Sequence, residues 1–353
     1  MRKTRVLVVD DSLFMRAAIA KTLAAGPFEI VGQAKDGTEA LAHIAKLRPD
    51  VVTMDFNMPG MNGAETVREV MRTHPTPVVM FSAHTRQGAK ETFDALAAGA
   101  VDFVTKPAGE VSTDLSKIAD ELMRKLADAA QSRPRVAMAP IPARPSGVMQ
   151  ALSPTGAPTR PTMSTLTGAL PRVCIIAIST GGPAALSEVI PALPETLKLA
   201  IVVVQHMPAG FTAHLAERLN SASMVIVREA QAGDRPLPGT VLIAPGDRHL
   251  EFDERGNVVL TVGALVNGCR PAADVTMQSA AKVFGRRTLA VVMTGMGRDG
   301  AAGALAIKRA DGKTLAQDQA TSVIYGMPKA AVDAGAIDEV AALGDIAAWL
   351  RYA

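Results

Sequence analysis

The sequence predicts an α/β protein with two doubly wound domains, each built on a mainly parallel β-sheet. In both halves of the chain, short apolar runs rich in Val and Ile alternate with segments of helical pattern. Such alternation is typical of buried parallel strands joined by crossover helices. A Pro-rich stretch at residues 128–171 separates the halves, and a length of 353 residues is enough for two domains.

The first domain is expected at residues 4–127 and contains five strand-like runs. Each run is followed by a segment with the apolar spacing of an amphipathic helix, so the strands should lie parallel with helices on both faces of the sheet. The expected strands are residues 5–9, 29–33, 51–54, 77–81 and 101–105.

The second domain is expected at residues 172–353. The expected strands are residues 173–178, 199–204, 224–228, 241–244, 250–252, 258–261 and 289–293. Helices are expected near residues 184–193, 209–220, 272–284, 300–309 and 328–334. The polar turn at 253–257 predicts a β-hairpin inserted into an otherwise parallel scheme.

Residues 128–171 cannot bury enough apolar surface to order themselves, so they are expected to form a semi-extended linker.

Composition excludes several classes of protein. The net charge of +3 is small, and no basic stripe with interleaved aromatic residues indicates nucleic-acid binding. Cys174 and Cys269 make neither a disulfide framework nor a zinc site. With no leader pattern and no apolar run of membrane-spanning length, we expect a cytoplasmic protein without membrane insertion.

Polar side chains follow four strands of the first domain at the carboxyl edge of its sheet. Clustered carboxylates repel one another unless a cation neutralises them, and Mg²⁺ suits oxygen ligands. A carboxylate beside Mg²⁺ can attack a phosphoryl donor and form an acyl phosphate. Any single Asp here could instead be a turn residue or a helix N-cap. The set that together favours a phosphorylation site is Asp10, Asp11, Asp55, Ser82 and Lys106.

Residues 4–125 resemble a response-regulator receiver domain, which has a flavodoxin-like fold. The resemblance rests on the motifs Val9-Asp10-Asp11-Ser12, Met54-Asp55-Phe56-Asn57-Met58-Pro59-Gly60 and Phe103-Val104-Thr105-Lys106-Pro107. It implies that Asp55 is the phospho-acceptor and that Asp10, Asp11, Asp55 and the Asn57 carbonyl hold Mg²⁺.

The same resemblance implies that Ser82 and Lys106 contact the phosphoryl group. Phe103 takes the position of the family's switch aromatic residue, or is an ordinary core residue. A cis peptide bond is also implied before Pro107.

In the second domain, Ser179 opens the sequence Ser-Thr-Gly-Gly-Pro directly after a strand-like run. Gly181 and Gly182 permit a tight turn, and Pro183 suits the first turn of a helix. This strand–turn–helix geometry exposes a hydroxyl and directs backbone N–H groups toward a developing oxyanion. The same turn could instead bind a phosphate or a nucleotide without any nucleophile.

His206 and Asp299 supply a base and an orienting acid for that nucleophile. Each follows another buried strand pattern, and the carboxyl ends of parallel strands meet at one edge of a sheet. We expect the Asp299 carboxylate to bind Nδ1–H of His206 and so to fix its tautomer. His249 is a rival base and Asp247 a rival orienter, whereas His214 is expected to face solvent or a partner.

Residues 172–350 resemble the catalytic domain of chemotaxis protein-glutamate methylesterases, a Rossmann-like fold. The motifs are Ser179–Pro183, Gln205–Met207, Ala244–Asp247, Arg270-Pro271, Ser279–Ala281 and Thr294–Gly300, together with Thr85–Ala89 in the receiver. The order receiver, linker, hydrolase also matches that family. Asn57 stands where the family has Glu, and Ala272-Ala273 where it commonly has Ser-Val.

The resemblance implies a phosphorylation-activated serine hydrolase with Ser179 as nucleophile, His206 as general base and Asp299 as orienting acid. Met296 and Thr180 would support the active site, Met296 by donating its backbone N–H to the oxyanion. The hydrolase would need no cofactor.

The implied reaction is hydrolysis of glutamate methyl esters, and deamidation of glutamines, on the cytoplasmic helices of chemotaxis receptors. A chemotaxis histidine kinase would supply the phosphoryl group. Three alternatives stay open: a non-catalytic output domain that binds a ligand or partner, an esterase for a protein outside chemotaxis, and a DNA-binding regulator. The last lacks a helix-turn-helix with a basic recognition helix.

Overall fold

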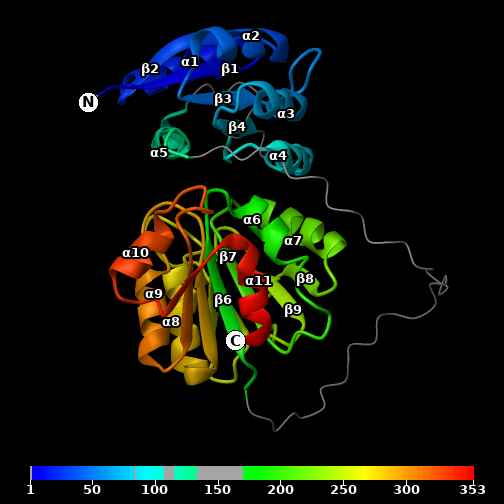
Figure 1. Ribbon diagram of the computed structural model, residues 1–353, viewed down its shortest axis with the longest axis vertical. Coiled ribbons are helices and arrows are strands. Elements are labelled where there is room, and N and C mark those ends of the chain that lie inside the picture. The colour runs from blue at the N-terminus through cyan, green and yellow to red at the C-terminus, as the bar shows by residue number, and fades with distance from the viewer. Residues whose placement is uncertain (1, 83–84, 107–114, 133–169) are drawn as a thin grey trace, which may run out of the picture.

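The computed structural model describes residues 2–82, 85–106, 115–132 and 170–353. They form two α/β domains, and the first is seated over one edge of the second (Figure 1). The predicted pair of parallel-sheet domains is confirmed. Most of the predicted linker and the peptide bond before Pro107 lie outside the described residues.

The first domain has a five-stranded parallel sheet of order β2-β1-β3-β4-β5. The strands are β1 (Thr4–Val9), β2 (Phe28–Ala34), β3 (Val51–Asp55), β4 (Val78–Ser82) and β5 (Asp102–Thr105). The helices are α1 (Leu13–Ala24), α2 (Gly37–Leu47), α3 (Gly63–Thr73), α4 (Arg86–Ala98) and α5 (Ala119–Ala129), with a 3₁₀ turn at Leu115–Lys117.

Both faces of this sheet are buried, because alternate residues of each strand point to opposite sides. Helices α1 and α5 pack on one face against Val6, Val8 and Phe81. Helices α2, α3 and α4 cover the other face, against Leu7 and Met54. The polar residues that end β1, β3 and β4 are thereby left at one edge of the sheet, as predicted.

The second domain has a seven-stranded parallel sheet of order β14-β13-β12-β6-β7-β9-β8, and an antiparallel hairpin of β10 and β11. Its strands are β6 (Val173–Ile178), β7 (Ala200–Gln205), β8 (Ile226–Glu229), β9 (Thr240–Ile243), β10 (His249–Phe252), β11 (Val258–Thr261), β12 (Thr288–Val292), β13 (Lys313–Gln317) and β14 (Glu339–Ala341). Its helices are α6 (Gly182–Val189), α7 (Phe211–Ala222), α8 (Ala273–Phe284), α9 (Ala301–Arg309), α10 (Met327–Asp333) and α11 (Leu343–Tyr352), with a 3₁₀ turn at Gly285–Arg287.

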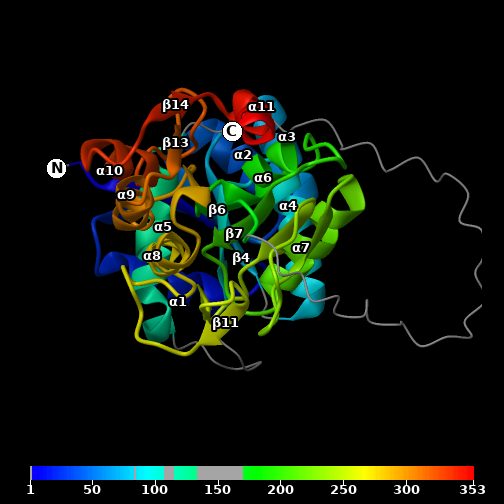
Figure 2. The same cartoon turned by 90° about the horizontal axis from the view of Figure 1, so that it is seen from below.

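Strand β6 is the point at which the strand order of this sheet reverses. It pairs with β7 on one side and β12 on the other. Helices α6, α7 and α11 pack on one face of the sheet, and α8, α9 and α10 on the other (Figure 2). Ligands of such sheets bind at the carboxyl ends of the strands beside the reversal point. That is the edge over which the first domain lies (Figure 1).

The sequence prediction omits β13, β14 and α11. Strand β13 reads Lys-Thr-Leu-Ala-Gln, with a single large apolar residue, and β14 has three residues, of which two are exposed. These two strands are too short, and too poor in large apolar residues, for an alternating pattern to be detected in the sequence. The predicted hairpin and the other strands are present with small shifts at their ends. The longest described helix, α4, has 13 residues, and none in the described part of the chain could cross a bilayer.

Candidate functional site

Ser179 lies in the sharp turn between β6 and α6. Its backbone N–H donates to the Thr294 carbonyl at 3.0 Å, and the Gly182 N–H donates to the Ser179 carbonyl at 2.8 Å. Gly181 has φ +77°, a left-handed conformation that favours glycine, and a Cβ there would lie 2.7 Å from Val323. The strand–turn–helix geometry expected from the sequence is therefore present.

His206 and Asp299 form a hydrogen-bonded pair at the same edge of the sheet. His206 follows β7, Asp299 lies between β12 and α9, and His206 Nε2 is 2.7 Å from Asp299 Oδ2. The buried Asp299 carboxylate also accepts the backbone N–H groups of Ala273 at 2.6 Å and Asp274 at 3.0 Å. These are free donors at the N-terminus of α8, where a negative charge is favoured.

The prediction that Asp299 binds Nδ1 of His206 is wrong, because the carboxylate, held by α8, approaches the ring from its Nε2 side. Nδ1 lies instead 3.6 Å from Cys269 Sγ. Among the described residues no hydrogen bond joins the Ser179 hydroxyl to this ring. Gln205 links the two backbones, since its Nε2 donates to the carbonyls of Ser179 at 3.0 Å and His206 at 3.3 Å.

The two side chains of this pair have opposite pKa shifts. Burial acts to lower the pKa of His206, but hydrogen bonds with Asp299 and Cys269 and their charges raise it to about 9. Burial acts to raise the pKa of Asp299, but the hydrogen bond and charge of His206, with the backbone donors of α8, hold it below its ordinary value. Both shifts favour a protonated ring beside an ionised carboxylate.

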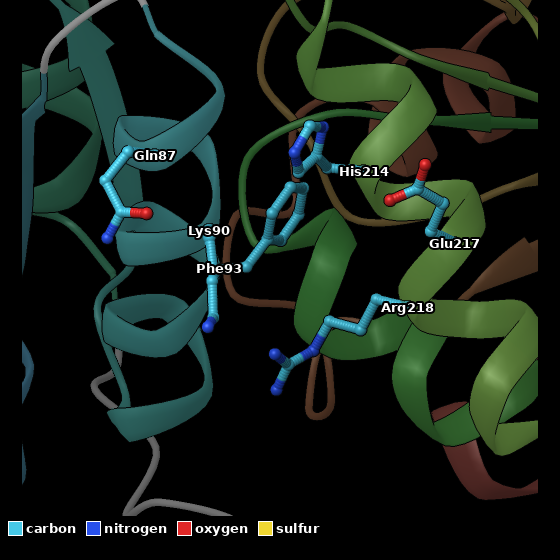
Figure 3. A pocket seen from close by; sticks show the side chains of 6 residues that line it. All are labelled: Gln87, Lys90, Phe93, His214, Glu217 and Arg218. Carbon is cyan, nitrogen blue, oxygen red and sulfur yellow. The ribbon is translucent and has the colours of Figure 1, made fainter.

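The alternative base, His249, and the alternative orienting acid, Asp247, are not part of this hydrogen-bonded pair. His249 is buried between the Ala264 carbonyl, 2.9 Å from its Nε2, and the Ala272 N–H, which donates to Nδ1 at 3.3 Å, so both ring nitrogens have structural partners. Asp247 is exposed, with φ +61°. His214 lies on α7 and faces α4 of the first domain (Figure 3).

Sequence reasoning missed three residues around the pair: Asn267, Cys269 and Asp274. Asn267 Nδ2 donates to Asp299 Oδ1 at 3.1 Å and to Asp274 Oδ2 at 2.8 Å. The available signal was the dipeptide Asn267-Gly268, which is typical of a two-residue hairpin turn.

The two residues expected to support the active site have different surroundings. Met296 follows β12 and is 38% exposed. Its backbone N–H makes no hydrogen bond within the described residues. Thr180 is buried, and its hydroxyl donates to Asp102 Oδ2 of the first domain at 2.6 Å.

The first domain brings Asp10, Asp11 and Asp55 together, with one oxygen of each within 4.8 Å of the others. Lys106 Nζ lies 3.1 Å from Asp10 Oδ2 and 2.9 Å from Asp55 Oδ1. Burial raises the pKa of Asp55 to about 6, against the opposing charge of Lys106. Three carboxylates that face one point fit a hard divalent cation such as Mg²⁺.

Ser82 and Asn57 lie beside this cluster. The Ser82 hydroxyl donates to the Gly88 carbonyl at 3.1 Å and accepts from the Thr92 hydroxyl at 2.7 Å. The Asn57 side chain donates to Glu91 Oε2 at 3.2 Å, so it points to α4, and any metal contact would have to come from its backbone carbonyl.

The two domains meet close to Ser179. Phe103 of β5 stacks on Phe211 of α7, with ring centroids 4.7 Å apart. An open pocket of about 470 Å³ lies between helices α4 and α7. Its lining side chains come from both helices, with Phe93 directed across the gap (Figure 3). They are Gln87, Lys90, Phe93, His214, Glu217 and Arg218.

Both domains match known protein families. Residues 174–350 match the family model described as CheB methylesterase, and residues 6–116 match the response regulator receiver domain. A protein-glutamate methylesterase/protein-glutamine glutaminase of Symbiobacterium thermophilum is 46% identical, over 98% of this chain and 96% of its own. A protein of the same description from Pyrococcus abyssi is 45% identical, over 98% and 92%.

Among solved structures, the CheB methylesterase catalytic domain of Thermotoga maritima superimposes with a TM-score of 0.50 at 43% identity. The match covers 52% of this chain and 98% of the Thermotoga maritima chain.

Proposed function

The chain belongs to the protein-glutamate methylesterase/protein-glutamine glutaminase family, and we propose that Ser179, His206 and Asp299 carry out its ester hydrolysis. It is an enzyme of the carboxylic ester hydrolase class whose receiver domain regulates it by phosphorylation. The observation that carries the proposal is the 2.7 Å bond between His206 and Asp299, at the sheet edge that also holds Ser179.

Acylation begins when neutral His206 donates Nε2–H to Asp299, which leaves Nδ1 as the proton acceptor. The Ser179 oxygen attacks the ester carbonyl carbon and its proton passes to Nδ1, which would first have to give up its contact with Cys269 Sγ. The carbonyl oxygen becomes an oxyanion, and the N–H of Met296, which has no partner among the described residues, would donate to it. The C–O bond to the methoxy group then breaks, and methanol leaves with the proton from Nδ1.

Deacylation repeats these steps with water. Water attacks the acyl carbon, Nδ1 takes its proton, and the bond to the Ser179 oxygen breaks as that oxygen regains a proton. A glutamine side chain enters the same sequence with ammonia as the leaving group. Deamidation and demethylation therefore require the same residues.

Phosphorylation takes place in the first domain. Asp10, Asp11, Asp55 and the Asn57 carbonyl would hold Mg²⁺, which supplies charge neutralisation during phosphoryl transfer. Asp55 is the acceptor we propose, and Ser82 and Lys106 would contact the new phosphoryl oxygens. The Ser82 hydroxyl would first have to give up its bond to the Gly88 carbonyl.

We further propose that the docked receiver limits access to the hydrolase site and that phosphorylation weakens this docking. The contact between Asp102 and Thr180, the residue after Ser179, supports this. Residues 128–171 would act as the linker between a receiver at 4–127 and a catalytic domain at 172–353. The protein would act in the cytoplasm on receptor helices, with a chemotaxis histidine kinase as phosphodonor.

The experiment that tests this function is methanol release from methylated chemoreceptor membranes. Ser179→Ala should lower the rate by roughly a thousandfold or more, because it removes the nucleophile. Ser187→Ala is the matched control, since in the described part of the chain that hydroxyl donates to the Pro183 carbonyl within α6. A Ser179→Ala protein as active as wild type would refute the assignment.

A further inference from the structure

The segment Val266–Cys269 forms a tight hairpin turn beside the catalytic pair. The Val266 N–H donates to the Cys269 carbonyl at 3.1 Å, and the Cys269 N–H donates to the Val266 carbonyl at 2.9 Å. The central residues Asn267 and Gly268 have φ +52° and +76°. Two successive positive φ values define a type I′ turn, which Asn-Gly favours more than other dipeptides. The backbone of this turn is therefore fixed by its own sequence.

The first side chain that the turn delivers is the Asn267 amide. Its Nδ2 reaches two buried carboxylates, Asp299 Oδ1 at 3.1 Å and Asp274 Oδ2 at 2.8 Å. The charge of Asp299 contributes to the raised pKa of Asp274, after the larger effect of burial. The Asn267 amide gives each carboxylate a hydrogen-bond donor, and its bond to Asp274 acts against the rise in the pKa of that carboxyl.

Asp274 and Asp299 also bind each other's helix. The backbone N–H of Asp274 donates to Asp299, while Asp274 Oδ1 accepts the N–H groups of Gly300 at 2.9 Å and Gly303 at 2.7 Å. Each carboxylate thus satisfies free donors at the start of the other helix. Asn267, from outside these helices, donates to both carboxylates.

The second side chain that the turn delivers is the Cys269 thiol. Its Sγ lies 3.6 Å from His206 Nδ1, on the opposite side of the ring from Asp299. Cys269 is half-buried and also approaches the Asn267 carbonyl at 3.7 Å. The ring is therefore held between a carboxylate on one nitrogen and a thiol on the other.

We propose that the turn Val266–Cys269 is a positioning element of the catalytic pair, in which Asn267 fixes Asp299 and Cys269 fixes the His206 ring. Within the described residues the turn makes no hydrogen bond to Ser179. Its role is to orient the base and its acid, and in that sense it rests on the proposed function. The pairing of Cys269 with His206 also contributes to the raised pKa of the ring.

The variant Asn267→Gly tests the first contact, because glycine keeps the positive φ of the turn and removes only the amide. We expect kcat for methanol release to fall roughly tenfold with KM unchanged, the size of effect for a lost hydrogen bond to a charged group. Asn257→Gly is the matched control, since its amide donates to Asp253 at 3.0 Å in the β10–β11 hairpin. Equal kcat in Asn267→Gly and wild type would overturn the role of Asn267.

The variant Cys269→Ala tests the second contact without relying on turnover. The His206 pKa is measured on the full chain by NMR titration of labelled histidines, with the His206 resonance identified by its loss in His206→Gln. We expect Cys269→Ala to move this pKa to lower pH and Cys269→Ser, which retains an acceptor, to restore most of the shift. An unchanged pKa in Cys269→Ala would overturn the role of Cys269.

The two kinds of failure are distinguishable. If wild type releases no methanol, the proposed function fails, while the His206 titration still decides whether the turn controls the ring. If wild type is active and neither variant changes kcat or the His206 pKa, the turn is only structural.

Discussion

His206 lies between a carboxylate at Nε2 and a thiol at Nδ1, and these two neighbours decide how it can act. Both contacts stabilise the protonated ring and together outweigh the effect of burial, which acts in the other direction. A general base must start unprotonated. The arrangement therefore favours the protonated ring, which must lose its proton before it can act as a base.

This predicts the pH dependence of activity. Because the His206 pKa is raised to about 9, kcat/KM for methanol release should rise tenfold per pH unit below that value and level off above it. Initial rates measured across the neutral and alkaline range, at low substrate concentration, test this. A profile that is already flat at neutral pH would contradict the raised pKa.

At the scale of secondary-structure elements, the site depends on the N-termini of α8 and α9, which exchange carboxylates. Asp274 is buried and accepts three hydrogen bonds, two from backbone N–H groups at the start of α9 and one from Asn267. Removing it leaves buried donors without a partner, which costs more than removing an exposed ion pair.

We therefore predict that Asp274→Ala lowers the free energy of unfolding by about 3 kcal/mol. Urea unfolding of the full chain, followed by far-UV circular dichroism, measures the change. Asp333→Ala is the control, because its partner Lys329 lies on the surface, and it should change little. Equal stability of the two variants would show that the bonds of Asp274 add nothing to stability.

The sequence predicted the strands that position the site better than it predicted the contacts of the site. Ser179, His206 and Asp299 each follow a run of apolar, mostly β-branched residues, so their place at one sheet edge follows from parallel topology. The partner of each ring nitrogen of His206 does not, because Asn267, Cys269 and Asp274 come from a turn and a helix start. Their approach depends on tertiary packing, which no local pattern encodes.

At the scale of the whole molecule, the receiver is joined to the hydrolase close to the nucleophile. The Phe103 ring stacks on Phe211, and Asp102 accepts the Thr180 hydroxyl. Phe103 follows Asp102 in β5, and the Phe103 backbone carbonyl accepts a hydrogen bond from the buried Lys125 ammonium. A change at the phosphorylation site that moves β5 would therefore act directly on this contact.

Weakening the contact should raise the basal activity. We predict that Phe103→Ala increases methanol release without phosphodonor by roughly two- to tenfold, the range for loss of an aromatic pair. Phe28→Leu, in the core on the α1/α5 side of the receiver, is the control for general loosening of that domain. A basal rate unchanged by Phe103→Ala would mean that the aromatic stack does not restrain the hydrolase.

The measurement that tests the central claim most directly is the initial rate of methanol release with and without a small-molecule phosphodonor, for wild type, Asp55→Asn and Ser179→Ala. The account predicts that phosphodonor raises the rate of wild type and has no effect on the rate of Asp55→Asn. Ser179→Ala should release almost no methanol with or without phosphodonor. Activation of Asp55→Asn by phosphodonor, or substantial turnover by Ser179→Ala, would contradict it.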